Sequence, residues 1–192
     1  MEKKLFIFDM GGVMCTNTNV IDDICEKLGL TQRAFFNNIS ADNLRGIKTG
    51  KLSMKEFWHR FSANSGIAVD KDYFKSFFSP RRNQCMYSIV NELKRNNRVV
   101  AGTNTIEPHY QKHLENGDYD IFDKVYPSNT LGISKPDTGF YKEILKSEEV
   151  EPRKTVFIDD RAENLKTAEV LGIHSILFTS CDDLREKIRI FF

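Results

Sequence analysis

The sequence predicts an α/β protein: a doubly wound parallel sheet with an all-helical segment inserted after its first strand. Short, wholly apolar runs alternate along the chain with stretches of helical periodicity, the pattern of a parallel sheet covered by helices. The stretch 17–87 departs from this alternation, because it contains helical patterns and no convincing strand. The polar residues that could carry chemistry directly follow apolar runs, where parallel sheets bind their ligands.

The first strand is predicted at Leu5–Phe8, a wholly apolar run that suits a strand buried on both faces. It ends at Asp9, and Gly11 and Gly12 follow where the backbone can turn tightly. Further strands are predicted at 99–101, 121–126, 156–158 and 175–178. Between them, apolar residues at helical spacing predict helices around 86–93, 140–145 and 165–171, with Gly172 placed as a helix stop.

The inserted segment 17–87 is predicted to fold as a module of its own. A capping box at 53–56 leads into Phe57, Trp58 and Phe61 at helical spacing. Seven of the fifteen phenylalanines lie in this stretch, so it can bury its own apolar surface and is not a linker. We expect residues 1–16 and 88–192 to form the core, and 79–83 to be a polar hinge with a solvated Arg81–Arg82 pair.

Composition excludes several classes of function. The chain has 192 residues, enough for one core with a small inserted module, and its 28 basic residues nearly balance its 27 acidic ones. This balance provides no polyanion-binding face, so we expect no nucleic-acid partner. No stretch approaches the roughly 20 apolar residues that span a bilayer, so we expect no membrane insertion.

The cysteines and the N-terminus indicate a cytoplasmic protein. Cys15, Cys25, Cys85 and Cys181 are scattered and show no metal-ligand or redox spacing, so reduced thiols are expected. The apolar run near the N-terminus is too short for a signal peptide. Cys15 lies close to the first strand but has no predicted base beside it, so it is interpreted as a small buried hydrophobe.

Four groups of polar residues are predicted to meet at one edge of the sheet. They are Asp9 after the first strand, 103–105 after the second, Lys135 in the loop before a helix, and Asp159–Asp160 after the fourth strand. Each group alone is a weak signal, because loops after strands are commonly polar. Four groups in this order at one edge indicate a functional site.

This arrangement resembles the haloacid dehalogenase superfamily along the whole chain. The resemblance is carried by Phe8-Asp9-Met10-Gly11-Gly12-Val13, by Thr103, by Lys135 within Gly132-Ile133-Ser134-Lys135-Pro136-Asp137, and by Phe157-Ile158-Asp159-Asp160-Arg161-Ala162-Glu163-Asn164. It implies a Rossmann-like core whose helical insert is the family's small, C1-type cap. It also implies a hydrolase that requires Mg²⁺.

The resemblance implies a role for each motif. Asp9 would be the nucleophile that attacks a phosphate monoester and forms an aspartyl-phosphate. Lys135 would supply positive charge to the phosphoryl group, and Thr103 would donate its hydroxyl to a phosphate oxygen. Backbone N–H groups near Gly11, Gly12 and Asn104 would assist.

The family pattern also implies a magnesium site. Its ligands would be Asp9, the carbonyl oxygen of Gly11 and Asp160. Asp159 would lie mainly behind these ligands and support them. Magnesium prefers a few carboxylates together with water.

Gly11 is the departure from the family pattern. Most phosphatases of the family have an Asp there that serves as general acid and base, a role that contributes roughly 100- to 10,000-fold. A subgroup of sugar-phosphate phosphatases with a similar Asp-x-Gly motif, an Asn-Thr pair and a nearby His resembles this chain through Asn104, Thr105 and His109. The expected substrate is therefore a small phosphorylated metabolite, a sugar phosphate or similar.

Two other functions stay open from the sequence. A metal-independent, haloacid dehalogenase-type hydrolase would also use Asp9, but Asp159 and Asp160 beside it would repel a third carboxylate without a cation. A non-catalytic phosphometabolite-binding protein is favoured by Gly11. A metal shared by His109 and His113 lacks a recognisable third ligand, so these histidines are expected at the surface or behind the site.

Overall fold

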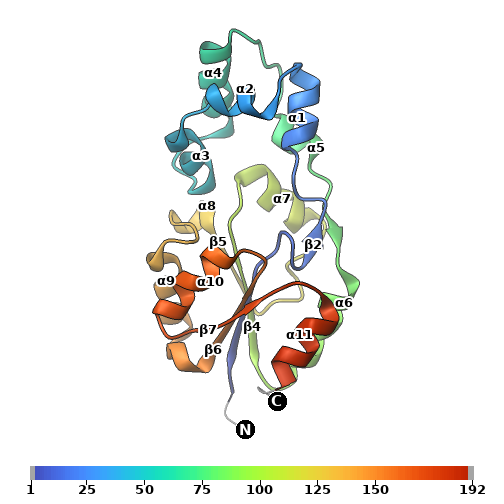
Figure 1. Ribbon diagram of the computed structural model, residues 1–192, viewed down its shortest axis with the longest axis vertical. Coiled ribbons are helices and arrows are strands. Elements are labelled where there is room, and N and C mark those ends of the chain that lie inside the picture. Colours follow the sequence, from blue (N-terminus) through green and yellow to red (C-terminus); the bar gives the residue numbers. More distant parts are fainter. Residues whose placement is uncertain (1–2, 190–192) are drawn as a thin grey trace.

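The computed structural model describes residues 3–189 and contains a five-stranded parallel sheet (Figure 1). Its strand order is β5-β4-β1-β6-β7, so the chain starts in the centre and builds outward on both sides. The strands are β1 (Leu5–Phe8), β4 (Arg98–Thr103), β5 (Lys124–Pro127), β6 (Thr155–Asp159) and β7 (His174–Leu177). The predicted doubly wound α/β fold is confirmed, although β5 starts three residues later than expected because 121–123 form a turn.

Helices cover both faces of the sheet, and successive residues of β1 therefore enter different cores. Phe6 and Phe8 pack in one cluster with residues of α6 (Gln84–Lys94) and α11 (Cys181–Ile188). Leu5 and Ile7 pack in the other with residues of α9 (Thr138–Glu148) and α10 (Ala162–Val170). Burial on both faces explains why this strand is wholly apolar.

The inserted segment forms a helical module with its own apolar core, at the top of Figure 1. It consists of α1 (Ile21–Leu28), α2 (Gln32–Asn37), α3 (Ala41–Lys48), α4 (Met54–Ser65) and α5 (Tyr73–Phe77). Ser53 caps α4, its hydroxyl accepting the backbone N–H of Glu56, as the capping box predicts. Trp58 lies at the centre of the aromatic packing, within 6 Å of the rings of Phe57, Phe61 and Phe74.

The two chain segments that join the module to the core form a short antiparallel ribbon of β2 (Cys15–Thr16) and β3 (Arg81–Arg82). The sequence analysis predicted a solvated Arg81–Arg82 pair and no strand at this position. In the structure, the guanidinium of Arg82 lies 2.6 Å from Asp118 and also donates to the carbonyl of Asn116. The two linkers are far apart in sequence but run side by side, so their backbone groups can pair. The boundary expected at residue 87 falls inside α6, whose Met86 packs in the core of the sheet.

The expectation that all cysteines are reduced is wrong for one pair. Cys85 and Cys181 form a disulfide between the first turns of α6 and α11, 96 residues apart in sequence. These helices cover the same face of the sheet, a proximity that no sequence spacing reveals. The argument for a cytoplasmic location from reduced thiols therefore fails. Cys15 is a buried free thiol, as expected, and its Sγ donates to the carbonyl of Met10.

Two further helices complete the core near the module: α7 (Glu107–Glu115) and α8 (Ser128–Leu131). Among the residues 3–189, no helix has the length and apolar content needed to cross a membrane.

Candidate active site

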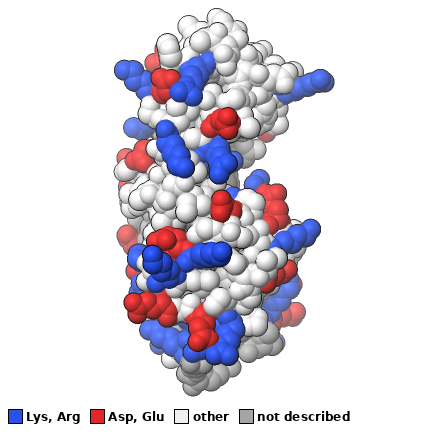
Figure 2. All heavy atoms as spheres, turned by 90° about the vertical axis from the view of Figure 1, so that its left-hand side faces the viewer, with Lys and Arg blue, Asp and Glu red and all other residues white. Residues whose placement is uncertain are grey.

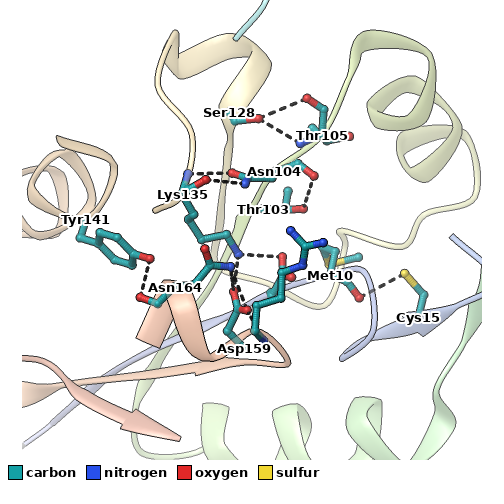
Figure 3. A network of polar contacts seen from close by, with 12 residues as sticks. Met10, Cys15, Thr103, Asn104, Thr105, Ser128, Lys135, Tyr141, Asp159 and Asn164 are labelled. Atoms are coloured by element: carbon teal, nitrogen blue, oxygen red, sulfur yellow. Dashed lines mark hydrogen bonds and ion pairs between the residues drawn. The ribbon is translucent and has the colours of Figure 1, made fainter. Parts of the chain in front are cut away.

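The four predicted polar groups meet at the carboxyl edge of the sheet, where Lys135 joins two carboxylates (Figure 3). Its Nζ lies 2.9 Å from Oδ1 of Asp9, which follows β1, and 2.7 Å from Oδ2 of Asp159, which ends β6. All three residues are buried. Because β1 and β6 are neighbouring parallel strands, their carboxyl ends place both acids beside one cation.

Asn104, just after β4, holds the backbone of Lys135 in a reciprocal pair of hydrogen bonds. The Asn104 side-chain amide donates to the carbonyl oxygen of Lys135 at 2.8 Å, and its oxygen accepts the Lys135 backbone N–H at 2.8 Å. The sequence predicted a backbone contribution from Asn104 and did not predict this clamp. Asn104 therefore fixes the loop that carries the cation.

Asp159 is fully buried and completely hydrogen-bonded. Besides Lys135, it accepts the backbone N–H of Arg161 at 2.8 Å and the side-chain amide of Asn164 at 2.9 Å. A buried charge is tolerated when it is paired in this way. Tyr141 in turn donates to the carbonyl of Asn164, which ties the start of α10 to α9.

Asp9, Asp159 and Asp160 place carboxylate oxygens within 4.8 Å of one another. Burial raises the pKa of Asp9 to about 6, with Lys135 lowering it and the Asp159 charge raising it further. Asp160 is exposed, and its oxygens complete an all-oxygen donor set of the kind that Mg²⁺ prefers. The residues present therefore fit a magnesium ion.

The two glycines after β1 have different roles. Gly12 has a φ of +80°, and a Cβ there would lie 2.1 Å from Oδ2 of Asp160, so only glycine fits. The Gly12 N–H donates to the carbonyl of Cys15 and is not free for a phosphate, contrary to the expectation. Gly11 lies outside the left-handed region, and a Cβ there would lie 3.2 Å from Oγ1 of Thr18.

A cavity of about 300 Å³ opens onto this cluster. Its lining residues are Asp9, Gly11, Gly12, Thr18, Lys48, Asn104, Lys135, Asp160, Arg161 and Asn164. Thr103, which the sequence assigned to the phosphate, is buried at the end of β4 beside this cavity, with its hydroxyl 3.5 Å from the carbonyl of Asn104. It does not line the cavity in this conformation.

Three cavity residues that sequence reasoning missed lie toward the helical module: Thr18, Lys48 and Arg161. Lys48 ends α3, and Ser128 in the core donates its hydroxyl to the Lys48 carbonyl at 2.6 Å, which fixes the module over the site. Desolvation and the nearby Arg161 hold the pKa of Lys48 below its ordinary value. Figure 2 shows Lys and Arg side chains spread over this face of the molecule, mixed with Asp and Glu.

The missed residues differ in how visible they are in the sequence. Asn164 lies five residues after Asp159 in a motif already recognised, and its position in the first turn of α10 could have marked it as a partner of Asp159. Thr18 and Lys48 carry no such signal, because the fold of the helical module decides where they point.

Neither histidine of α7 takes the surface position, which was one of the two positions expected. His113 is buried, with Nδ1 2.7 Å from Asp118. His109 stacks on Phe78 with ring centroids 3.7 Å apart, and its Nε2 lies 3.2 Å from the carbonyl of Phe74. Burial lowers the pKa of His109 to about 4. Both histidines attach α7 to the segment that leaves the module, and among residues 3–189 neither belongs to a cluster that could hold a metal.

Comparisons with known proteins agree with this geometry. A sequence model of the haloacid dehalogenase-like hydrolases matches residues 3–172. The sesquiterpene phosphatase astK of Aspergillus oryzae is 26% identical, over 96% of both chains. The HAD family enzyme bt-2542 of Bacteroides thetaiotaomicron superposes with a TM-score of 0.83 at 21% identity, over 98% of this chain and 100% of that one. A structure of wild-type bt-2542 holding magnesium and inorganic phosphate superposes with a TM-score of 0.80 at 21% identity, over the same shares of both chains.

Proposed function

The chain belongs to the haloacid dehalogenase-like hydrolases, and from this membership we propose that it is a magnesium-dependent phosphatase of a small phosphorylated metabolite, a sugar phosphate or similar. The observation that carries the proposal is Lys135, a buried cation 2.9 Å from Asp9 at the floor of a cavity. The Lys135 ammonium group lies beside one carboxylate oxygen of Asp9. The same positive charge would stabilise the negatively charged phosphoryl group that Asp9 attacks.

In the proposed reaction, the Asp9 carboxylate attacks the phosphorus of a monoester and displaces the alcohol. An aspartyl-phosphate on Asp9 results, and water then hydrolyses it and restores the carboxylate. Lys135 holds Asp9 in position and stabilises the negative charge that spreads over the phosphoryl oxygens. Asn104 keeps Lys135 in place through its two backbone hydrogen bonds.

Magnesium would be held by Asp9, Asp160 and the carbonyl of Gly11, and it would supply positive charge beside a phosphoryl oxygen. Asp159 contributes indirectly, because both of its oxygens are already hydrogen-bonded to protein donors. Two relatives support this proposal: astK is named a phosphatase, and bt-2542 binds magnesium and phosphate.

The test is hydrolysis of p-nitrophenyl phosphate and of a panel of phosphorylated metabolites, each with magnesium and with a chelator. We expect magnesium-dependent phosphate release and a hydroxylamine-sensitive phosphoenzyme on Asp9. Turnover that is independent of magnesium would favour the dehalogenase-type alternative. Phosphate binding without turnover of any ester would favour the non-catalytic alternative.

A further inference from the structure

The proposed phosphatase lacks a carboxylic acid two residues after its nucleophile, because Gly11 stands there. Without a proton, an alkoxide leaves phosphorus slowly, so some group must deliver one to the leaving oxygen. The structure shows what occupies the place of the missing side chain.

That place is occupied by the hydroxyl of Thr18. A Cβ built on Gly11 would lie 3.2 Å from Oγ1 of Thr18. The three atoms nearest to this Cβ all belong to Thr18. An Asp side chain at position 11 would therefore extend into the space that this hydroxyl fills. Thr18 belongs to the segment between β2 and α1, so it reaches the site from the chain that enters the helical module.

The Thr18 hydroxyl is also available. Thr18 is half-buried and lines the cavity with Asp9 and Lys135. It is the only residue with a hydroxyl among those lining the cavity, and its Oγ1 has no hydrogen-bond partner among residues 3–189. By contrast, the neighbouring hydroxyl of Ser128 is committed to the carbonyl of Lys48. A hydroxyl can donate and accept at the same time, which a proton relay requires.

We propose that Thr18 relays the proton that the leaving group needs, in place of the absent acid at Gly11. This inference rests on the proposed phosphatase function. The substrate is the monoanion of the phosphate monoester, which carries one proton on a phosphoryl oxygen.

The proton balance of the first step closes without an external acid. Thr18 passes its hydroxyl proton to the ester oxygen and takes up the phosphoryl proton, while the Asp9 carboxylate bonds to phosphorus and the P–O ester bond breaks. The products are the neutral alcohol and a dianionic aspartyl-phosphate. In the second step water attacks phosphorus, and Thr18 returns a water proton to a phosphoryl oxygen. The products are the Asp9 carboxylate and dihydrogen phosphate.

Other proton donors near the site fit this role less well. The thiol of Cys15 is buried and already donates to Met10. Lys48 lines the cavity from α3, and nothing directs its amine toward the position that Gly11 leaves open. It is nevertheless the competing donor, so it provides the comparison in the test.

The test compares leaving groups in Thr18→Val, Thr18→Ser and Lys48→Met. The substrates are p-nitrophenyl phosphate, whose leaving group departs without a proton, and n-propyl phosphate, whose leaving group needs one. For Thr18→Val we expect kcat on propyl phosphate to fall by roughly 10- to 100-fold, the lower part of the range for acid–base catalysis, and kcat on p-nitrophenyl phosphate to stay within about threefold. Thr18→Ser should restore most of the loss, because serine keeps the hydroxyl.

An equal loss on both substrates, or no loss on either, would overturn the relay. A selective loss in Lys48→Met instead of Thr18→Val would assign the proton to Lys48. These outcomes are separate from the phosphatase proposal, which would fail if the wild-type protein hydrolyses no phosphate ester, if its turnover does not depend on magnesium, or if Asp9→Asn keeps the activity. Melting curves of each variant exclude unfolding as the cause.

Discussion

The candidate active site has two unlike walls. The buried wall consists of Lys135, Asp159 and Asn164, which are at most 4% exposed; Lys135 and Asn164 both donate hydrogen bonds to Asp159. The open wall consists of Thr18, Lys48 and Arg161, of which Thr18 is half-buried and the other two are exposed. Buried charges must be paired to be tolerated, whereas exposed charged groups stay solvated by water until a ligand binds. We infer that the buried wall holds Asp9 in a fixed geometry, and that the open wall, which includes the Thr18 of the proposed proton relay, faces the substrate.

The largest expected effect is that of replacing Asp9, the proposed nucleophile, which lines the cavity together with both walls. Asp9→Asn should lower p-nitrophenyl phosphate turnover by on the order of 10⁴-fold or more, because the amide cannot form the aspartyl-phosphate. The fold should persist, since the change is isosteric and removes a carboxylate whose pKa burial has raised to about 6. Steady-state kinetics with a circular dichroism melting curve measures both. Activity within tenfold of wild type would remove Asp9 from the mechanism.

The second prediction contrasts neighbouring aspartates. Asp159→Ala should lower the free energy of unfolding by about 3 kcal/mol, because it strips a partner from buried Lys135. Asp160→Ala should change it by no more than about 0.5 kcal/mol, since Asp160 is exposed. Urea denaturation in a chelator measures both.

Calorimetric titration of the same two variants with magnesium should give the opposite ranking. Asp160→Ala should no longer bind magnesium, and Asp159→Ala should reduce the magnesium affinity by a smaller amount. Equal affinity in wild type and Asp160→Ala would contradict the ligand assignment.

The buried wall was largely visible in the sequence, and the open wall was not. A strand buried on both faces must be apolar, so β1 and β6 stand out, and the acids that end them are forced to one edge. Lys135 was noticed as one polar loop residue among others, and its role came only from the resemblance to a known motif, because a loop position follows from no periodicity. Thr18 and Lys48 depend on how the helical module docks, which a single Ser128 hydrogen bond to the α3 terminus helps to fix.

The same distinction explains the wrong predictions. The disulfide of Cys85 and Cys181, the bound Arg82 and the stacking of His109 on Phe78 all connect segments distant in sequence. Local patterns specify elements and their buried faces. They do not specify which distant side chains will be neighbours.

The third prediction concerns the attachment of the module that carries Lys48 to the core. His109 has a pKa of about 4 in the folded protein and about 6.5 when unfolded. The unfolded chain therefore binds more protons between these values, and the stabilising contribution present above pH 6.5 is lost as the pH falls toward 4. The loss is at most about 3 kcal/mol, at 1.36 kcal/mol per pKa unit.

The variant that isolates this effect is His109→Phe, which keeps an aromatic ring against Phe78 and cannot titrate. Its free energy of unfolding, measured by urea denaturation of the metal-free protein, should fall less steeply between pH 6.5 and 4 than that of the wild type. If the free energy of unfolding of the two proteins falls equally with pH, His109 is not the source of this pH dependence.

The smallest expected effect tests whether the open wall acts in binding. Lys48→Met should raise KM for a phosphate ester by up to about tenfold with kcat within about threefold, because an exposed cation attracts the anionic substrate without touching the reacting bond. Lys55→Met is the matched control: Lys55 is also an exposed lysine of the module, but it lines a different cavity beside Trp58, so its KM should not change. Added salt should raise the KM of the wild type more than that of Lys48→Met, because salt screens the attraction. A fall in kcat at constant KM would instead place Lys48 among the groups that act in the transition state, and its role in substrate binding would then be wrong.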